Sequence, residues 1–87
     1  MKMHKVKASP RDYQKSESWN TWKKEVSEFP WKYPANERCL ILKGYARVTD
    51  IDGNTLDFGE GDLVTFPKGL ECKWKIIRDV EKKYMLF

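Results

Sequence analysis

The stretch from Gly61 to Ile76 constrains the fold more than any other part of the chain. It holds two apolar, alternating runs on either side of Pro67-Lys68-Gly69. Proline fixes φ at the first central position of a turn, and glycine supplies a backbone conformation closed to other residues. Alternation with a period of two indicates half-buried strands. The stretch therefore predicts a strand, a tight turn and a second strand, paired as a β-hairpin.

The length and composition indicate one small domain. A chain of 87 residues has no room for a second core, so we expect a single domain over 1–87, with a tail and a short helix over 1–21 and a barrel over 22–87. The net charge is +4, and the lysines are scattered among acids, which is typical of a solvated surface. No clustered basic run marks a nucleic-acid site.

The N-terminal residues and the apolar runs predict a cytoplasmic protein with no membrane contact. The first seven residues lack the apolar segment of a signal peptide. The longest apolar run, Cys39-Leu40-Ile41-Leu42, is far too short to cross a bilayer. Two cysteines are too few for a disulfide scaffold, and we expect both to be thiols in a reducing compartment.

The remaining segments predict short strands after one helix. Residues 1–8 are expected to form a mobile or edge-pairing tail, and Ser9-Pro10-Arg11-Asp12 predicts a helix start with a serine cap. Aromatic residues alternate up to Tyr33, and Pro30 among them indicates an edge strand or a bulge. Further strands are expected at 37–42, closed by Gly44, and at 45–49, 55–58 and 83–87. Roughly eight short strands at this spacing favour an all-β sandwich or barrel.

Two motifs resemble those of the cupin superfamily. The second cupin motif is a glycine, five residues, Pro-x-Gly, two residues and a metal-binding histidine; Gly61, Pro67 and Gly69 match it, and Cys72 stands at the histidine position. In the first motif, Glu37 matches the glutamate, and the closing glycine follows after six residues. The two histidines of that motif are replaced by Trp31 and Tyr33, and the only histidine of the chain is His4.

The departures from the motif form a pattern of their own. Phe-x-Trp-x-Tyr, then Asn-Glu-x-Cys-x-Ile-Leu-x-Gly, then the Gly61 stretch are similar to the ureidoglycine aminohydrolase-type cupin-domain family. Members often carry His-Tyr near the C-terminus, where this chain has Lys83-Tyr84. The resemblance implies an all-β cupin (RmlC-like jelly-roll) barrel with one short N-terminal helix. Because all three histidine ligands of the motifs are replaced, we expect neither the usual histidine-based metal site nor a cofactor.

Strand periodicity predicts which side chains line the pocket, independently of the family. If Glu37 and Cys72 point inward, the residues two positions further along each strand do so too. The predicted ligand-binding residues are Trp31, Tyr33, Glu37, Cys39, Cys72 and Trp74. The rings are alternatively a solid barrel filling, the thiols small core hydrophobes, and Glu37 an outward residue on a frayed strand start. A carboxylate among aromatic rings loses hydration and demands a partner.

These residues support competing functions. The leading hypothesis is metal-independent binding of a small polar metabolite, nitrogen-rich or sugar-like, with Glu37 accepting hydrogen bonds and the rings stacking. The second is an aminohydrolase- or isomerase-like enzyme with Glu37 as general acid or base and Cys72 as nucleophile, although no histidine or lysine is visibly placed to activate the thiol. An atypical metal held by Glu37 and the thiols is a further alternative.

Two further hypotheses concern macromolecular partners. The stretch 19–33 interleaves Trp, Lys and Phe as in single-strand nucleic-acid binders, but Glu25 and Glu28 interrupt it, and we expect no nucleic-acid partner. Leu40 and Leu42 face outward if their neighbours face inward, and an exposed apolar strip there would favour a homodimer. The helix could cover the strip instead, and the sequence leaves both arrangements open.

Overall fold

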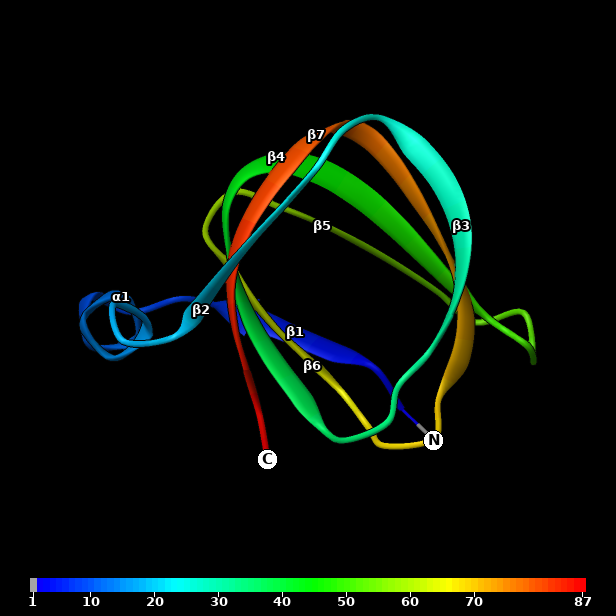
Figure 1. The fold of residues 1–87 in the computed structure, drawn as a ribbon, viewed down its shortest axis with the longest axis horizontal. Helices are drawn as coiled ribbons and strands as arrows, with labels where there is room; N and C mark the ends of the chain where they lie inside the picture. The colour runs from blue at the N-terminus through cyan, green and yellow to red at the C-terminus, as the bar shows by residue number, and fades with distance from the viewer. Residues whose placement is uncertain (1) are drawn as a thin grey trace.

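The computed structural model describes residues 2–87 and contains one short helix and seven strands. The elements in chain order are β1 (His4–Lys7), α1 (Pro10–Ser16), β2 (Asn20–Lys24), β3 (Ser27–Lys32), β4 (Glu37–Asp50), β5 (Thr55–Gly59), β6 (Asp62–Phe66) and β7 (Glu71–Leu86) (Figure 1). The prediction of an all-β barrel with one short N-terminal helix is confirmed. Within residues 2–87, no helix has the length and hydropathy needed to cross a bilayer.

The two long strands β4 and β7 organise the barrel. They lie side by side and antiparallel, so that residues 37–43 of β4 pair with 81–86 of β7, and residues 45–50 pair with 72–78. On the first half, β6 and β1 extend the sheet on one side and β2 on the other; on the second half, β5 and β3 flank the pair. Figure 1 shows the sheet curving around a central space. The core side chains lie between these two halves of the sheet.

Gly44 marks the bend of β4. The sequence predicted that a strand ends there, but β4 continues through Gly44 to Asp50. The φ of Gly44 is 95°, and a Cβ at this position would lie 2.1 Å from the backbone oxygen of Asp79 on β7. The pairing between β4 and β7 shifts register on both sides of Gly44. A glycine is therefore required here because β7 passes too close for any side chain, and the bulge turns one long strand from one half of the sheet into the other.

The prediction of a β-hairpin over Gly61–Ile76 is wrong, although its turn is present. Leu70 N–H donates to the Pro67 carbonyl oxygen at 3.2 Å. Beyond the turn, the strands separate: Phe66 of β6 pairs with Glu37 on one side, and Leu86 of β7 pairs with Glu37 on the other. The turn backbone bonds to Tyr33 instead. Gly69 N–H donates to the Tyr33 carbonyl oxygen, and Tyr33 N–H donates to the Leu70 carbonyl oxygen. The turn thus connects two strands that are both neighbours of β4.

The N-terminal predictions are confirmed for the residues that the structure describes; Met1 lies outside them. Ser9 caps α1, and Asp12 completes a reciprocal capping box with it. β1 pairs with β6 at the sheet edge, as expected of an edge-pairing tail. Pro30 lies in β3, which pairs only with β7 and is therefore an edge strand.

Leu40 is not exposed, which removes the basis for the predicted apolar strip. It is 0% exposed, Leu42 is half-buried, and α1 packs against β4. The structure therefore selects the alternative in which the helical segment covers this face, and the homodimer stays a prediction without that support. Further along the chain, the short strand predicted at 83–87 is the end of β7, which runs without a break from Glu71.

Candidate functional site

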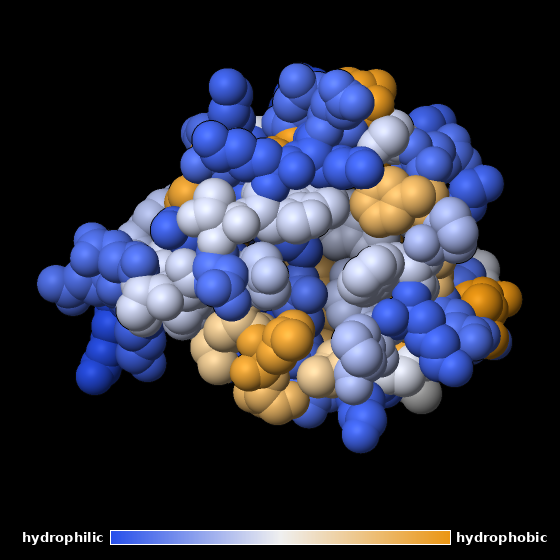
Figure 2. Space-filling model, viewed as in Figure 1, coloured by the Kyte–Doolittle hydropathy of each residue, from blue (hydrophilic) through white to orange (hydrophobic). Residues whose placement is uncertain are grey.

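A pocket of about 510 Å³ opens between β2, β3 and β7. Six aromatic residues form most of its wall, and two prolines, one leucine and three charged residues complete it. The lining consists of Trp22, Lys24, Phe29, Pro30, Trp31, Tyr33, Pro34, Glu37, Trp74, Lys82, Tyr84 and Leu86. Figure 2 shows charged and polar side chains over most of this face of the molecule, with paler residues at its centre.

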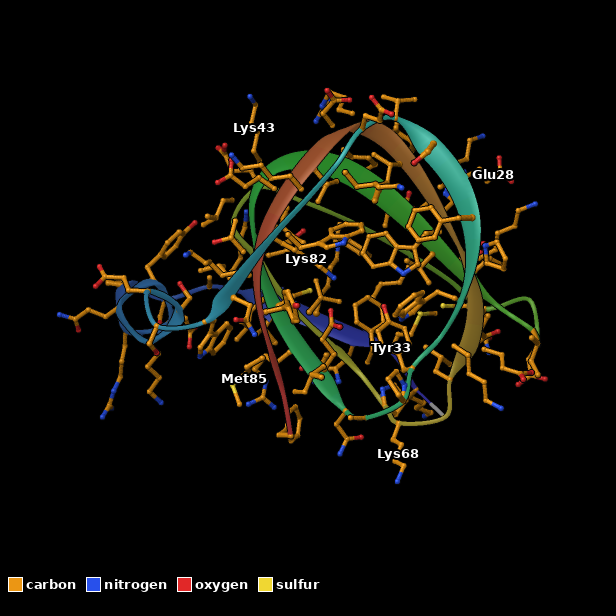
Figure 3. All side chains as sticks on the ribbon, viewed as in Figure 1. Glu28, Tyr33, Lys43, Lys68, Lys82 and Met85 are labelled. Carbon is orange, nitrogen blue, oxygen red and sulfur yellow. The ribbon has the colours of Figure 1, made fainter. Side chains whose placement is uncertain are left out.

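A buried ion pair lies in this pocket. Lys82 Nζ of β7 donates to Oε2 of Glu37 at 2.7 Å, and the two residues are 5% and 7% exposed. In Figure 3, Lys82 points into the barrel, whereas Lys43 and Lys68 project outward. Glu37 begins β4 directly after Asn36, whose side-chain oxygen accepts from Lys68 N–H at 2.8 Å. The turn and β7 together fix the two charges against each other.

Aromatic faces surround the ammonium group of Lys82. Its Nζ lies 4.8 Å from the ring centroids of both Trp22 and Trp74 and 5.7 Å from that of Tyr84. Each of these rings attracts a cation through its negative face, and the attraction grows when water is excluded. The rings therefore hold the charge of Lys82 in place, together with the carboxylate of Glu37.

The pair retains hydrogen-bonding capacity toward the pocket. The bond to Lys82 uses only Oε2 of Glu37, and no fully buried side-chain nitrogen or oxygen atom in residues 2–87 lacks a partner. Oε1 of Glu37 therefore keeps contact with the pocket. The ammonium of Lys82 has three N–H donors, of which one is engaged by Glu37. The pair thus keeps a free acceptor on Glu37, and Lys82 has two further N–H groups that form no hydrogen bond within the described part of the chain and lie among the rings of the pocket wall.

Tyr33 connects the pocket wall to the core. Trp74 donates its indole N–H to the Tyr33 hydroxyl oxygen at 3.1 Å, and the Tyr33 ring stacks on Phe66 with centroids 4.7 Å apart. Burial, followed by the negative charge of Glu37, raises the pKa of the Tyr33 phenol far above its ordinary value of 10.0. Tyr33 is consequently a neutral group that contributes shape and hydrogen bonding but no charge.

Four of the six sequence-predicted site residues line the pocket. Tyr33, Glu37 and Trp74 form its buried part, and Trp31 stands at its mouth with 48% exposure. Cys39 is 0% exposed and belongs to the hydrophobic core. Neither Cys39 nor Cys72 is part of the pocket lining. The structure thus places the aromatic wall and the carboxylate together and leaves the thiols outside.

Both thiols belong to the hydrophobic core of the barrel. Both cysteines are free, and the Cys72 sulfur lies 3.5 Å from the Trp31 carbonyl oxygen, to which it donates. Burial raises the pKa of Cys39 to about 12, and burial together with Asp50 raises that of Cys72 to about 11. Among residues 2–87, no group of three or more His, Cys, Asp and Glu side chains is arranged to hold a metal ion.

Sequence reasoning missed Lys82, the partner of Glu37. The alternation that turns Cys72, Trp74 and Ile76 inward is interrupted at the exposed Arg78, and it resumes in the same phase at Val80 and Lys82, which are buried. The same periodicity could therefore have found it. A lysine in a strand is usually a solvated residue, and this general tendency concealed the signal.

Comparison with known proteins identifies the family. The family model of the EutQ-like cupin domain matches residues 12–84. The crystal structure of a DUF861 family protein from Thermotoga maritima is 46% identical, with a TM-score of 0.95 over 99% of this chain and 100% of that chain.

Two more distant structures share the fold. The EutQ protein of Clostridium difficile is 19% identical, with a TM-score of 0.70 over 77% of this chain and 52% of that chain. A putative ethanolamine utilization protein Q from Salmonella typhimurium is 21% identical, with a TM-score of 0.71 over 98% of this chain and 68% of that chain. No protein with a curated function matches the chain. Since the family model spans most of its length, the chain belongs to the EutQ-like cupin domain family.

Proposed function

We propose that the barrel pocket binds a small polar molecule without a metal ion, through the Glu37–Lys82 pair and the aromatic wall. The observation that carries this proposal is the buried pair itself. Two opposite charges joined at 2.7 Å keep an unused acceptor and unused donors at the side of a pocket of about 510 Å³. Ligand sites commonly combine apolar walls with a few polar groups that fix orientation, and this pocket has that composition.

The pair defines what the ligand must present. Oε1 of Glu37 accepts a hydrogen bond from an N–H or O–H group, while the ammonium of Lys82 donates to an oxygen or nitrogen acceptor. Trp31, Tyr33 and Trp74 supply faces on which a flat group can stack. Nitrogen-rich metabolites and sugars both carry adjacent donors and acceptors. The finer resemblance to ureidoglycine aminohydrolase-type cupins favours the nitrogen-rich class.

Catalysis at the same site is the second candidate function. Glu37 is the residue that a ligand would touch, and a carboxylate beside an ammonium group can exchange a proton with a bound molecule. Cys72 is not favoured as a nucleophile, because it lies outside the pocket lining and burial raises its pKa to about 11. An enzyme at this site would therefore work with Glu37 and Lys82.

The other two hypotheses have less support. A metal held by Glu37 and both thiols would need three side chains that the structure does not bring together, and Lys82 already occupies one carboxylate oxygen. A nucleic-acid surface would need several exposed rings. Trp31 is exposed, but Trp22 and Phe29 turn toward the pocket, where their ring centroids are 6.3 Å apart. We therefore keep the pocket as the functional site.

The proposal is tested by ligand titration of wild-type protein and of Glu37→Gln. A panel of sugars, amides, ureides and hydroxy acids is screened by tryptophan fluorescence, since Trp22, Trp31 and Trp74 line the pocket. The substitution removes a charged acceptor and should weaken the affinity for any compound that binds in this screen by about tenfold or more. Glu28→Gln is the matched control, because Glu28 is exposed and pairs with Lys73 outside the barrel (Figure 3). Equal affinity in both variants would disprove the proposal.

A further inference from the structure

We propose that the ligand of this pocket is a small organic anion, namely a carboxylate with a hydrogen-bond donor on the adjacent carbon, as in 2-hydroxy carboxylates. The inference rests on the proposed function and adds the charge and the arrangement of groups. It follows from the balance of ionised residues in the lining, from the unpaired state of Lys24, and from the short distance between the two polar partners of the ligand.

The charged residues of the lining sum to a positive site. Two of them are lysines, Lys24 and Lys82, and one is an acid, Glu37. Tyr33, a phenol in the buried part of the pocket, is neutral because burial raises its pKa. The formal charge of the lining is therefore +1, from two positive charges and one negative charge. A singly charged anion neutralises this site, whereas a cation or a neutral molecule leaves the excess uncompensated.

Lys24 supplies the excess charge. Lys82 is matched by Glu37, but Lys24 forms no ion pair with any residue in 2–87. Its Nζ lies 5.5 Å from the centroid of the Phe29 ring, and Phe29 also belongs to the pocket wall. Lys24 is exposed, so its charge is available at the rim to an entering molecule.

Acidic residues near Lys24 do not cancel this charge within the pocket. Glu25, Asp79 and Glu81 line a second depression together with Lys24. None of them belongs to the lining of the aromatic pocket or forms an ion pair with Lys24. Asp79 instead accepts a hydrogen bond from the backbone N–H of Val26 at 2.9 Å. Glu37 is thus the only acid among the described residues that line the aromatic pocket.

The geometry of the pair sets the spacing of the ligand groups. Lys82 Nζ and Glu37 Oε2 are 2.7 Å apart, so the spare donors and the spare acceptor are also close neighbours. A ligand that uses both must carry an acceptor and a donor close together, for example on two neighbouring carbon atoms. A carboxylate oxygen facing Lys82, with a hydroxyl on the next carbon facing Glu37, satisfies this requirement. The charge-assisted bond to the ammonium is stronger than one made by a neutral carbonyl.

The test uses pairs of probes that share shape and differ in charge. Mandelate and glycolate are compared with mandelamide and glycolamide, in which the carboxylate is replaced by a neutral amide. Binding is followed by NMR through the indole N–H signals of Trp22, Trp31 and Trp74, with Trp19 as an internal reference outside the lining. Each probe is titrated into wild-type protein, Lys24→Gln and the control Lys23→Gln, which alters a neighbouring lysine that is not part of the lining.

The expected result is a preference for each acid over its amide by about tenfold, the size of one charge-assisted hydrogen bond. Lys24→Gln should weaken the acids about threefold to tenfold and change the amides less than about twofold, and Lys23→Gln should change neither. Equal binding of acids and amides, or no shift of the pocket signals by any acid, would overturn the inference. Amides that bind and depend on Glu37 would overturn it while supporting the proposed function.

Discussion

Lys82 and Glu37 are 45 residues apart in the sequence, yet their side chains meet at 2.7 Å inside the barrel. Each neutralises the charge of the other in a place where water is scarce. Taking two charges out of water carries a large penalty, which their mutual attraction and further contacts offset. The pair is therefore both the chemical centre of the pocket and a point where a single substitution should be costly.

Lys82→Met should destabilise the fold by about 3 kcal/mol, because it leaves the carboxylate of Glu37 buried without a partner. The double variant Glu37→Leu with Lys82→Met should recover at least half of that loss, since no buried charge remains. Urea denaturation of the wild type, the single variants Lys82→Met and Glu37→Leu, and the double variant gives the coupling between the two positions. If the double variant loses as much unfolding free energy as the two single variants together, the two charges are not coupled, and the explanation is wrong.

The matched control is the exposed pair of Glu28 and Lys73, in which Lys73 Nζ lies 2.8 Å from Glu28 Oε1. Their side chains are 48% and 61% exposed, and surface ion pairs of this kind add little to stability. Lys73→Met should leave the urea midpoint close to that of the wild type. A large effect there would mean that loss of lysine itself, rather than burial of an unpaired acid, explains the result at Lys82.

Gly44→Ala should destabilise the protein by about 2 kcal/mol or more, because two unfavourable terms act together. The residue has φ of 95°, and the new Cβ would lie 2.1 Å from the Asp79 backbone oxygen. Gly53→Ala is the control for the backbone term alone: its φ is 87°, and nothing lies within 4 Å of a Cβ there. That variant should cost only about 1 kcal/mol. Equal urea midpoints for the two variants would contradict the close approach of β4 and β7.

The sequence predicted the local features of the fold well and the long-range pairing less well. The capped helix at Ser9, the edge strand at Pro30 and the turn at Pro67 each depend on the conformational limits of a few adjacent residues. The partner of a strand depends on the whole chain. The Gly61 stretch therefore contained a correct turn but an incorrect hairpin, since Glu37 pairs with both Phe66 and Leu86.

The pocket shows the same division. Periodicity found Trp31, Tyr33, Glu37 and Trp74, because side-chain direction alternates along a strand. It also turned Cys39 inward, but an inward residue can belong either to the solid core or to the pocket. Alternation gives no depth along the barrel and does not distinguish the two. Lys82 lay on the inward face as well, and only the three-dimensional contact with Glu37 shows why a lysine is tolerated there.

Alkylation should be slow for both cysteines in the folded protein at neutral pH. Burial raises the pKa of Cys72 to about 11 and that of Cys39 to about 12, so the reactive thiolate is scarce. Labelling with iodoacetamide, followed by mass spectrometry, should show Cys72 reacting slowly, with a rate that rises with pH, and Cys39 reacting more slowly still. In urea both should react quickly. Rapid labelling of Cys72 in the native state at pH 7 would reopen its predicted role as a nucleophile.

Alkaline pH should reduce the stability of the fold through Cys39. Its folded-state pKa of about 12 lies above the ordinary value of 9.0, so the unfolded chain loses this proton first. The stabilising contribution is fully present below pH 9.0 and is lost as the pH rises toward about 12. Cys39→Ala removes this titration and should make the decline of the unfolding free energy shallower, by at most about 1.4 kcal/mol per pH unit.

Val64→Ala is the control, because Val64 pairs with Cys39 across β4 and β6 and is equally buried but does not titrate. Both variants should lose packing energy at every pH, whereas only Cys39→Ala should change the slope in urea unfolding curves measured from pH 8 upward; the same slope in both would show that Cys39 does not contribute to the alkaline transition.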